Sequence, residues 1–140
     1  MFLSEKNLKE AFWNNYNYNN RAIKYQFESE IREGGADLLT IERFQGNIQI
    51  NAFEFKLTDI KKVIEQAKAN MPYVNKSWIV VPAEKKYVIM DKYLCHIKEL
   101  QYIGVMIVKD SGAWEVLHQP KIQNEISFNQ ATLNLMMKGY

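Results

Sequence analysis

Apolar and polar residues follow two different periods along the first half of the chain. Apolar positions three and four residues apart predict a helix over about 5–16, with Ser4 as its N-cap. After Arg21 the period becomes two, and Gly34-Gly35 and Gln45-Gly46 supply turn signals between the alternating segments. This pattern predicts three consecutive strands, over about 23–30, 36–41 and 48–57.

Helical and strand patterns alternate in the second half of the chain. Thr58 can cap a helix whose apolar stripe starts at Ile60 and which Pro72 ends. Ser127 and Gln130 have the spacing of a capping box for a last helix. Between them the pattern predicts a buried strand, a helix and a two-strand hairpin, over 77–81, 84–101, 103–108 and 113–118. The order of elements predicts one α/β (α+β) domain over residues 1–140, with a mixed central sheet flanked by helices and a C-terminal β-hairpin and helix.

Composition narrows the class of protein without identifying it. The 140 residues are 47% hydrophobic and 24% charged, with six Gly and three Pro, which excludes disordered, collagen-like and low-complexity chains. The single cysteine, Cys95, has no partner for an internal disulfide, and with two His it cannot build a structural zinc site. No segment approaches the ~20 apolar residues of a membrane span, and the N-terminus lacks the apolar run of a signal peptide. We therefore expect a cytoplasmic protein without a membrane partner.

Two carboxylates fall on neighbouring predicted strands. Asp37 lies at the start of the second strand, and Glu54 on the third shares a face with Ile50 and Ala52. Facing side chains on adjacent antiparallel strands lie ~5 Å apart. Two carboxylates that close repel each other unless a cation lies between them, and Mg²⁺ prefers carboxylate and water oxygens. The spacing therefore predicts a shared divalent-cation site.

Lys56 shares a face with Glu54 two residues earlier, so its ammonium can reach the same centre. The acid-x-Lys pattern occurs three times, starting at Glu54, Asp59 and Glu84. The last two fall on predicted helical surface. Only the first lies on a strand that a hairpin joins to an aspartate and that a helix and an apolar strand follow. This context singles out Glu54 and Lys56 as candidates for chemistry on a phosphate.

Residues 28–82 resemble the PD-(D/E)XK nuclease superfamily, which has the restriction-endonuclease-like fold. The resemblance rests on Asp37, the segment Glu54-Phe55-Lys56, Gln66 on the following helix and the apolar strand closed by Pro82, together with the order of elements. It implies an αβββαβ core that hydrolyses phosphodiester bonds with Mg²⁺ or Mn²⁺. We therefore expect a nuclease that acts on DNA.

The resemblance also implies a set of metal ligands. On the matching positions, Asp37, Glu54 and the backbone carbonyl of Phe55 would hold the metal. Glu30 matches the upstream acid that some branches of the superfamily carry. Glu28 shares its face with Glu30, so the two compete for that assignment.

Other roles follow from the same resemblance. Lys56 would orient the attacking water or stabilise charge on the phosphate, and Gln66 would assist in positioning. A homodimer would let so small a nuclease cut two strands. Candidate phosphate contacts lie on the helix after the acid-x-Lys strand, at Lys61, Lys62 and Lys68.

Simpler interpretations of the same residues stay open. Asp37 after two glycines suits a turn, and Lys56 can serve as the ion-pair partner of Glu54. Gln66, on the flank of its helix, can face solvent. The alternative function is a non-catalytic nuclease-fold protein that binds nucleic acid or a protein partner, which the net charge of only +2 favours because strong DNA binders are more basic. An enzyme built on Cys95 or His118 lacks any supporting constellation.

Overall fold

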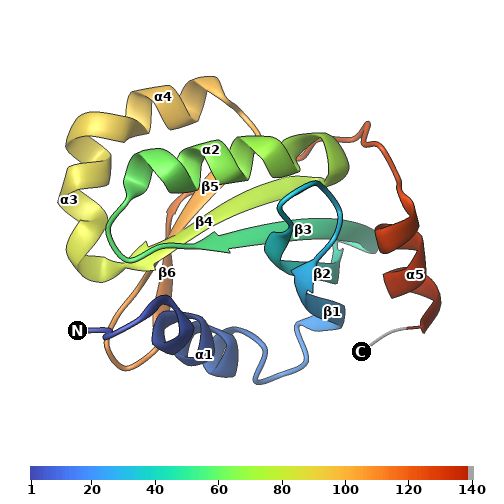
Figure 1. Cartoon of the computed structure of the whole chain (residues 1–140), viewed down its shortest axis with the longest axis horizontal. Coiled ribbons are helices and arrows are strands. Elements are labelled where there is room, and N and C mark those ends of the chain that lie inside the picture. Colours follow the sequence, from blue (N-terminus) through green and yellow to red (C-terminus); the bar gives the residue numbers. More distant parts are fainter. Residues whose placement is uncertain (139–140) are drawn as a thin grey trace.

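The computed structural model describes residues 1–138 and shows a mixed α/β architecture built on one sheet (Figure 1). In this part of the chain the sheet has six strands in the order β1-β2-β3-β4-β5-β6. The strands are β1 (Ala22–Ser29), β2 (Ala36–Phe44), β3 (Asn47–Phe55), β4 (Lys76–Pro82), β5 (Ile103–Val108) and β6 (Trp114–His118). The pairs β3–β4 and β4–β5 are parallel, and the other neighbouring pairs are antiparallel. The predicted mixed sheet and C-terminal hairpin are therefore confirmed.

Helices cover both faces of this sheet. They are α1 (Glu5–Tyr16), α2 (Ile60–Asn70), α3 (Lys86–Val88), α4 (Leu94–Glu99) and α5 (Gln130–Lys138). Shorter turns are the 3₁₀ segments η1 (Met71–Tyr73) and η2 (Ala83–Lys85) and the π-helical segment η3 (Ile89–Tyr93). In Figure 1, α1 lies on one side of the sheet, and α2 lies on the other side with α3 and α4. Within residues 1–138 no helix is long and apolar enough to cross a membrane.

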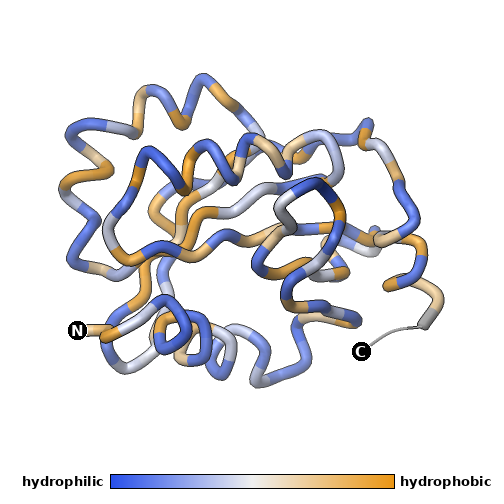
Figure 2. The backbone as a smooth tube through the Cα atoms, viewed as in Figure 1, coloured by the Kyte–Doolittle hydropathy of each residue, from blue (hydrophilic) through white to orange (hydrophobic). Residues whose placement is uncertain are grey.

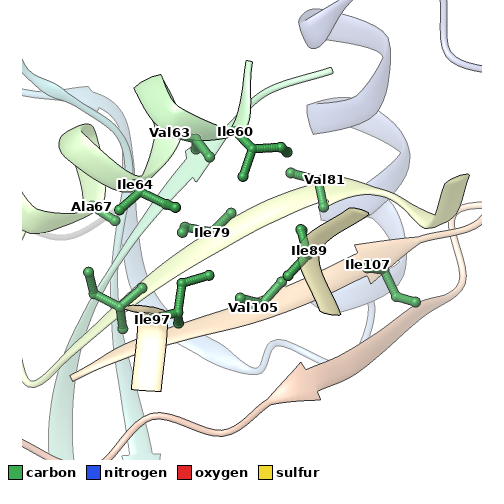
Figure 3. Close-up of a cluster of buried hydrophobic side chains, with 11 residues drawn as sticks. Ile60, Val63, Ile64, Ala67, Ile79, Val81, Ile89, Ile97, Val105 and Ile107 are labelled. Carbon is green, nitrogen blue, oxygen red and sulfur yellow. The ribbon is translucent and has the colours of Figure 1, made fainter. Parts of the chain in front are cut away.

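The core is divided by the sheet. On the α2 face, branched aliphatic side chains from α2, β4 and β5 interlock with Ile89 and Ile97 from the helical segments after β4 (Figure 3). A second cluster continues along this face over β2 and β3, where Leu135 of α5 covers Leu39 and Ile50. The α1 face is aromatic instead, because Phe12 packs on rings from β3. Hydrophobic positions accordingly run along the central strands in Figure 2.

Alternation along β3 sets which side chains face α2 and which face α1. Phe53 and Phe55 pack in the α1 cluster, whereas Ile50 and Ala52 pack in the cluster on the other face. Glu54 lies between the two phenylalanines and so points to the α2 face. The face assignments expected from the sequence therefore hold for this strand.

Two local expectations were wrong. Asp59, not Thr58, caps α2, because its Oδ1 accepts a hydrogen bond from the Lys62 N–H at 3.1 Å. The last helix begins at Gln130 with Asn129 as its cap, so the proposed capping box from Ser127 does not form. Asp and Asn accept from the first helical N–H groups as well as Ser and Thr do, which makes adjacent candidates hard to separate in sequence.

The segment expected to be helical over 84–101 is helical, as the unbroken succession of η2, α3, η3 and α4.

Candidate carboxylate site

Asp37 and Glu54 lie side by side on the α2 face of the sheet. The register that pairs Leu38 with Phe53 places Asp37 opposite Glu54 one residue further on. Each carboxyl is tied to the other strand: the Phe55 N–H donates to Oδ2 of Asp37 at 2.9 Å, and the Asp37 N–H donates to Oε2 of Glu54 at 3.4 Å. The charge of the Asp37 carboxyl also acts on that of Glu54. The predicted juxtaposition of the two acids is therefore present.

Glu54 is buried, with 1% of its surface exposed, and its Oε2 is surrounded by donors. The Asn70 side-chain amide donates to it at 2.8 Å, and the Arg32 guanidinium donates at 3.3 Å. Arg32 also donates from Nε to Oδ1 of Asn70 at 2.6 Å, so the three side chains form one closed network. A buried carboxylate is costly without such partners, and this network explains how the sheet holds one.

The surroundings raise the pKa of both carboxyls. Burial raises the pKa of Glu54 from 4.5 to about 7, and the neighbouring Asp37 adds to this, while Asn70 and Arg32 oppose it. Burial also raises the pKa of Asp37, against the opposing hydrogen bond from the Phe55 N–H; the charge of Glu28 raises it further. The close pair therefore favours keeping a proton, as two carboxylates in one site do.

Lys56 follows the end of β3, and its ammonium is directed elsewhere. Its Nζ lies 3.4 Å from Oε2 of Glu5, at the start of α1, and this is the ion pair that the structure gives it. The backbone N–H of Lys56 donates to the Val80 carbonyl at 3.2 Å, which fixes the main chain beside β4. The lysine is thus close to the acids in sequence, but its charged group pairs with α1.

The upstream acids and the helical glutamine occupy different surroundings. Glu28 and Glu30 are exposed and line a hollow of about 450 Å³ together with Arg32 and the two glycines of the β1–β2 turn. Glu28 pairs with Lys9 of α1 at 3.0 Å and acts on Asp37 through its charge. Gln66 on α2 is partly buried, and its Oε1 has no hydrogen-bond partner within residues 1–138.

The candidate phosphate-binding lysines lie on the outer side of α2. Lys61 and Lys62 are exposed, and Lys68 lies 3.6 Å from Glu65 one turn earlier. All three lie on α2 outside the buried stripe that packs on the sheet, so a ligand can approach them from outside. Cys95 is exposed on α4.

Sequence reasoning missed Arg32 and Asn70. Asn70 falls three residues after Ala67 and seven after Val63, so it occupies a position of the apolar stripe of α2 and is 0% exposed. A polar residue on the buried stripe of a helix predicts a hydrogen-bond partner on the element that the stripe packs against. Arg32 gave no comparable signal, because it lies in the β1–β2 loop and only the fold brings it to Glu54.

Asp37 and Glu54 form a small set of metal ligands, and that set is compatible with Mg²⁺. Within residues 1–138 no group of three or more His, Cys, Asp or Glu is placed to hold a metal ion. The donors described above take Oδ2 of Asp37 and Oε2 of Glu54, and leave Oδ1 and Oε1 for other contacts. Mg²⁺ usually keeps several waters and binds through one or two carboxylates plus substrate phosphate, so two carboxylates fit it.

Comparisons with known proteins bear on the fold. No family model matches the chain, and no curated protein matches it. A solved structure of a protein of unknown function from Silicibacter pomeroyi is similar, with a TM-score of 0.63 and 11% sequence identity. The similarity covers 100% of this chain and 86% of the other. It shows that the two chains share an architecture along the whole of this sequence.

Proposed function

We propose that the protein is a Mg²⁺- or Mn²⁺-dependent nuclease of the PD-(D/E)XK kind that hydrolyses phosphodiester bonds in DNA. The observation that carries the proposal is the adjacent pair Asp37 and Glu54 on one sheet face, half-buried and buried respectively, with the pKa of both groups raised. Perturbed acids that share one site are typical of functional centres. An ion bound between them would replace the proton that the pair otherwise favours.

The order of elements adds support. One helix, three antiparallel strands, a second helix and a strand parallel to the third follow one another as α1, β1–β3, α2 and β4. This is the αβββαβ order of the restriction-endonuclease-like core. The two acids lie on the second and third strands of that series, where the resemblance implies the metal ligands.

Each residue has a defined task in this proposal. Asp37 and Glu54, with the Phe55 carbonyl, would hold the ion, and Glu30 or Glu28 could reach it from the β1–β2 side. When bound, the ion lowers the pKa of a water and polarises the scissile phosphate. Asn70 and Arg32 would keep the Glu54 carboxylate in one orientation, because their donors converge on a single oxygen.

Lys56 requires a change of partner in order to act. Its pair with Glu5 is partly exposed, with side-chain exposures of 16% and 48%. Such surface pairs contribute only about 0.2–1 kcal/mol, so substrate phosphate can compete for the ammonium. Gln66 would assist positioning from α2, and Lys61, Lys62 and Lys68 would contact flanking phosphates of the DNA. A homodimer would present two such sites to the two strands.

The test is a cleavage assay on plasmid, single-stranded and branched DNA with Mg²⁺ or Mn²⁺. We expect Asp37→Asn and Lys56→Ala to lower the cleavage rate by at least 100-fold. Lys92→Ala, which alters an exposed lysine on η3, serves as the matched control and should leave the rate unchanged. Circular dichroism and gel filtration of every variant check folding and report the oligomeric state. Equal rates in the wild type and in both site variants would refute the proposal.

The second candidate is a non-catalytic nuclease-fold protein that binds nucleic acid or a protein partner. The Arg32–Glu54–Asn70 network favours it, because an arginine already supplies the buried acid with a cation. Calorimetry with Mg²⁺ separates the two functions. A nuclease should bind the ion and lose that binding in Asp37→Asn, whereas a non-catalytic protein should show no heat of binding in either form.

A further inference from the structure

A polar cavity lies on the α1 face of the sheet, on the opposite side from the carboxylate site. The helix α1 ends at Tyr16 and leaves uncovered the part of this face where β2 ends and β4 begins. The resulting cavity has a volume of about 270 Å³. Its walls come from β2 to β6, the α1 end and the loop before β1, so a single site gathers residues from Tyr16 to Gln119.

Three cationic residues line this cavity, and the side chains of Arg21 and Lys76 face it. Arg21 packs its guanidinium over the rings of Tyr16 and Trp114, at 4.9 Å from each centroid. Its Nε donates to the Tyr16 carbonyl at 3.3 Å, and the structure gives its two terminal nitrogens no protein acceptor within residues 1–138. Two aromatic rings thus hold a planar fork of free donors in place, a geometry suited to phosphate. Arg43 lines the same wall.

Lys76 is the most buried of the three cations, with 8% of its surface exposed. Its Nζ lies 4.6 Å from the centroid of the Phe44 ring, and within residues 1–138 no acid lies close enough to form an ion pair with it. Burial lowers the pKa of this ammonium, and the charge of Glu42 opposes the shift. A buried cation without an anion is costly, which indicates that the anion comes from outside.

Glu42 supplies one negative charge on this wall, and hydroxyl groups of the protein hold its oxygens in place. The Tyr16 hydroxyl donates to Oε1 and Oε2 of Glu42 at 2.8 and 2.9 Å, and the Thr40 hydroxyl donates to Oε2 at 2.6 Å. With one acid against three cations, the lining carries a net positive charge. It therefore favours an anionic ligand.

The other walls suit a flat ring with polar edges. Asn51 is 3% exposed, lines the cavity, and has a buried Oδ1 without a hydrogen-bond partner. Gln49, which is 6% exposed, adds a second amide beside it. Side-chain amides of this kind read the edges of nucleobases. The indole of Trp78 and the ring of Phe44 supply flat apolar surface for stacking.

We propose that this cavity binds a nucleoside monophosphate, with the phosphate on Arg21 and Lys76 and the base against Asn51, Gln49 and the aromatic wall. The volume of about 270 Å³ lies at the lower end for ligand sites, so it suits one base and one phosphate rather than a dinucleotide. The site does not depend on the proposed nuclease activity, because it uses different residues on the other face of the sheet.

Calorimetry with AMP, CMP, adenosine and inorganic phosphate tests the proposal. We expect AMP or CMP to bind at least tenfold more tightly than either adenosine or phosphate alone, because each half-ligand meets only part of the lining. Lys76→Met, which keeps the length of the side chain and removes its charge, should weaken AMP binding at least tenfold. Arg21→Gln, at an exposed position, gives a second variant should Lys76→Met unfold, and Lys92→Met on η3 is the matched control.

Indole ¹H–¹⁵N spectra place the ligand. The chain has three tryptophans; Trp78 and Trp114 line the cavity, whereas Trp13 packs against Tyr25 and Phe27 elsewhere. AMP should shift the signals of Trp78 and Trp114 and leave that of Trp13 unchanged. Absence of AMP and CMP binding at millimolar concentration would overturn the proposal. So would equal affinities for AMP and inorganic phosphate, or AMP binding that neither Lys76→Met nor Arg21→Gln weakens.

Discussion

Glu54 and Lys76 are buried on opposite faces of the sheet, and their surroundings differ. On the α2 face, Glu54 accepts from an amide, a guanidinium and a backbone N–H, so the protein itself supplies its partners. On the α1 face, Lys76 has an aromatic ring beside it and forms no ion pair within residues 1–138, although the charge of Glu42 acts on it. A buried charge whose hydrogen-bond and ion-pair partners come from the protein is held in one geometry. A buried charge without an ion-pair partner is stabilised when a ligand of opposite charge binds. The carboxylate site around Glu54 is therefore fixed in shape by the protein, whereas the cavity around Lys76 is suited to binding an anion.

Removing the cation beside Glu54 should have the largest effect on stability. We expect Arg32→Met to lower the free energy of unfolding by about 3–5 kcal/mol at pH 8, because it leaves a buried carboxylate without its charged partner. At pH 5 the loss should be smaller, since Glu54 can then take up a proton. Urea unfolding at both pH values measures this. Arg43→Met, at an exposed position, is the control and should change stability by less than about 0.5 kcal/mol. Equal losses at the two pH values would contradict the role assigned to Arg32.

The next largest effect is the change in the free energy of unfolding of the wild-type protein with pH. Because the pKa of Glu54 is raised from 4.5 to about 7 on folding, the folded state binds more protons between these values. Stability is therefore full below about pH 4.5 and declines as pH rises toward 7, by up to about 3 kcal/mol from this group.

Urea titrations from pH 4.5 to 8 measure this decline, and Glu54→Gln should flatten it. Saturating Mg²⁺ at pH 8 should restore stability if the pair binds the ion, because a ligand of the folded state stabilises it. A wild-type profile that rises over this range, or one that Glu54→Gln leaves unchanged, would show that the pair does not titrate as described.

Removing the buried charge of Lys76 should raise the stability of the protein. Lys76→Met replaces a buried ammonium by an apolar chain of similar length, so we expect stability to rise by about 1–2 kcal/mol at pH 7. Thermal and urea unfolding measure the gain, with Lys61→Met on the surface of α2 as the neutral comparison. A loss of more than about 1 kcal/mol would mean that Lys76 has a structural partner after all.

The smallest effect concerns the pair that holds Lys56. Glu5→Gln should change the free energy of unfolding by no more than about 0.5 kcal/mol, because the pair is partly exposed. It should also release the ammonium, so the rate of DNA cleavage should stay equal or rise. Cleavage that falls tenfold in Glu5→Gln would instead indicate that the Glu5–Lys56 pair is needed where it is. Lys9→Gln on the same helix is the comparison variant, because Lys9 pairs with Glu28 and its replacement leaves the Glu5–Lys56 pair intact.

The carboxylate pair could be predicted because it depends on local rules. Alternation puts Asp37 and Glu54 on one face, and the hairpin that joins their strands fixes the register. Lys56 lies just beyond the end of β3, and its long side chain pairs with Glu5, 51 residues earlier on α1. Alternation gives the direction in which a side chain leaves the strand and does not give the partner that its charged end finds.

The residues that complete both sites could not be found in the same way. Asn70 was detectable as a polar residue on a buried helical stripe, whereas Arg32 depends on the path of a loop. The cavity beside Lys76 arises because α1 ends at Tyr16 and leaves part of a face open, and no local pattern records that.

The sequence by itself determined the elements, the order in which they occur and the face on which each strand residue lies, since these follow from periods of two and 3.6 residues and from turn chemistry. Tertiary structure alone decided that Arg32 and Asn70 donate hydrogen bonds to Glu54 while Lys76 forms no ion pair within residues 1–138. The reason is physical: the balance of a buried charge depends on which groups from distant segments come within about 3 Å of it, and such contacts are set by packing.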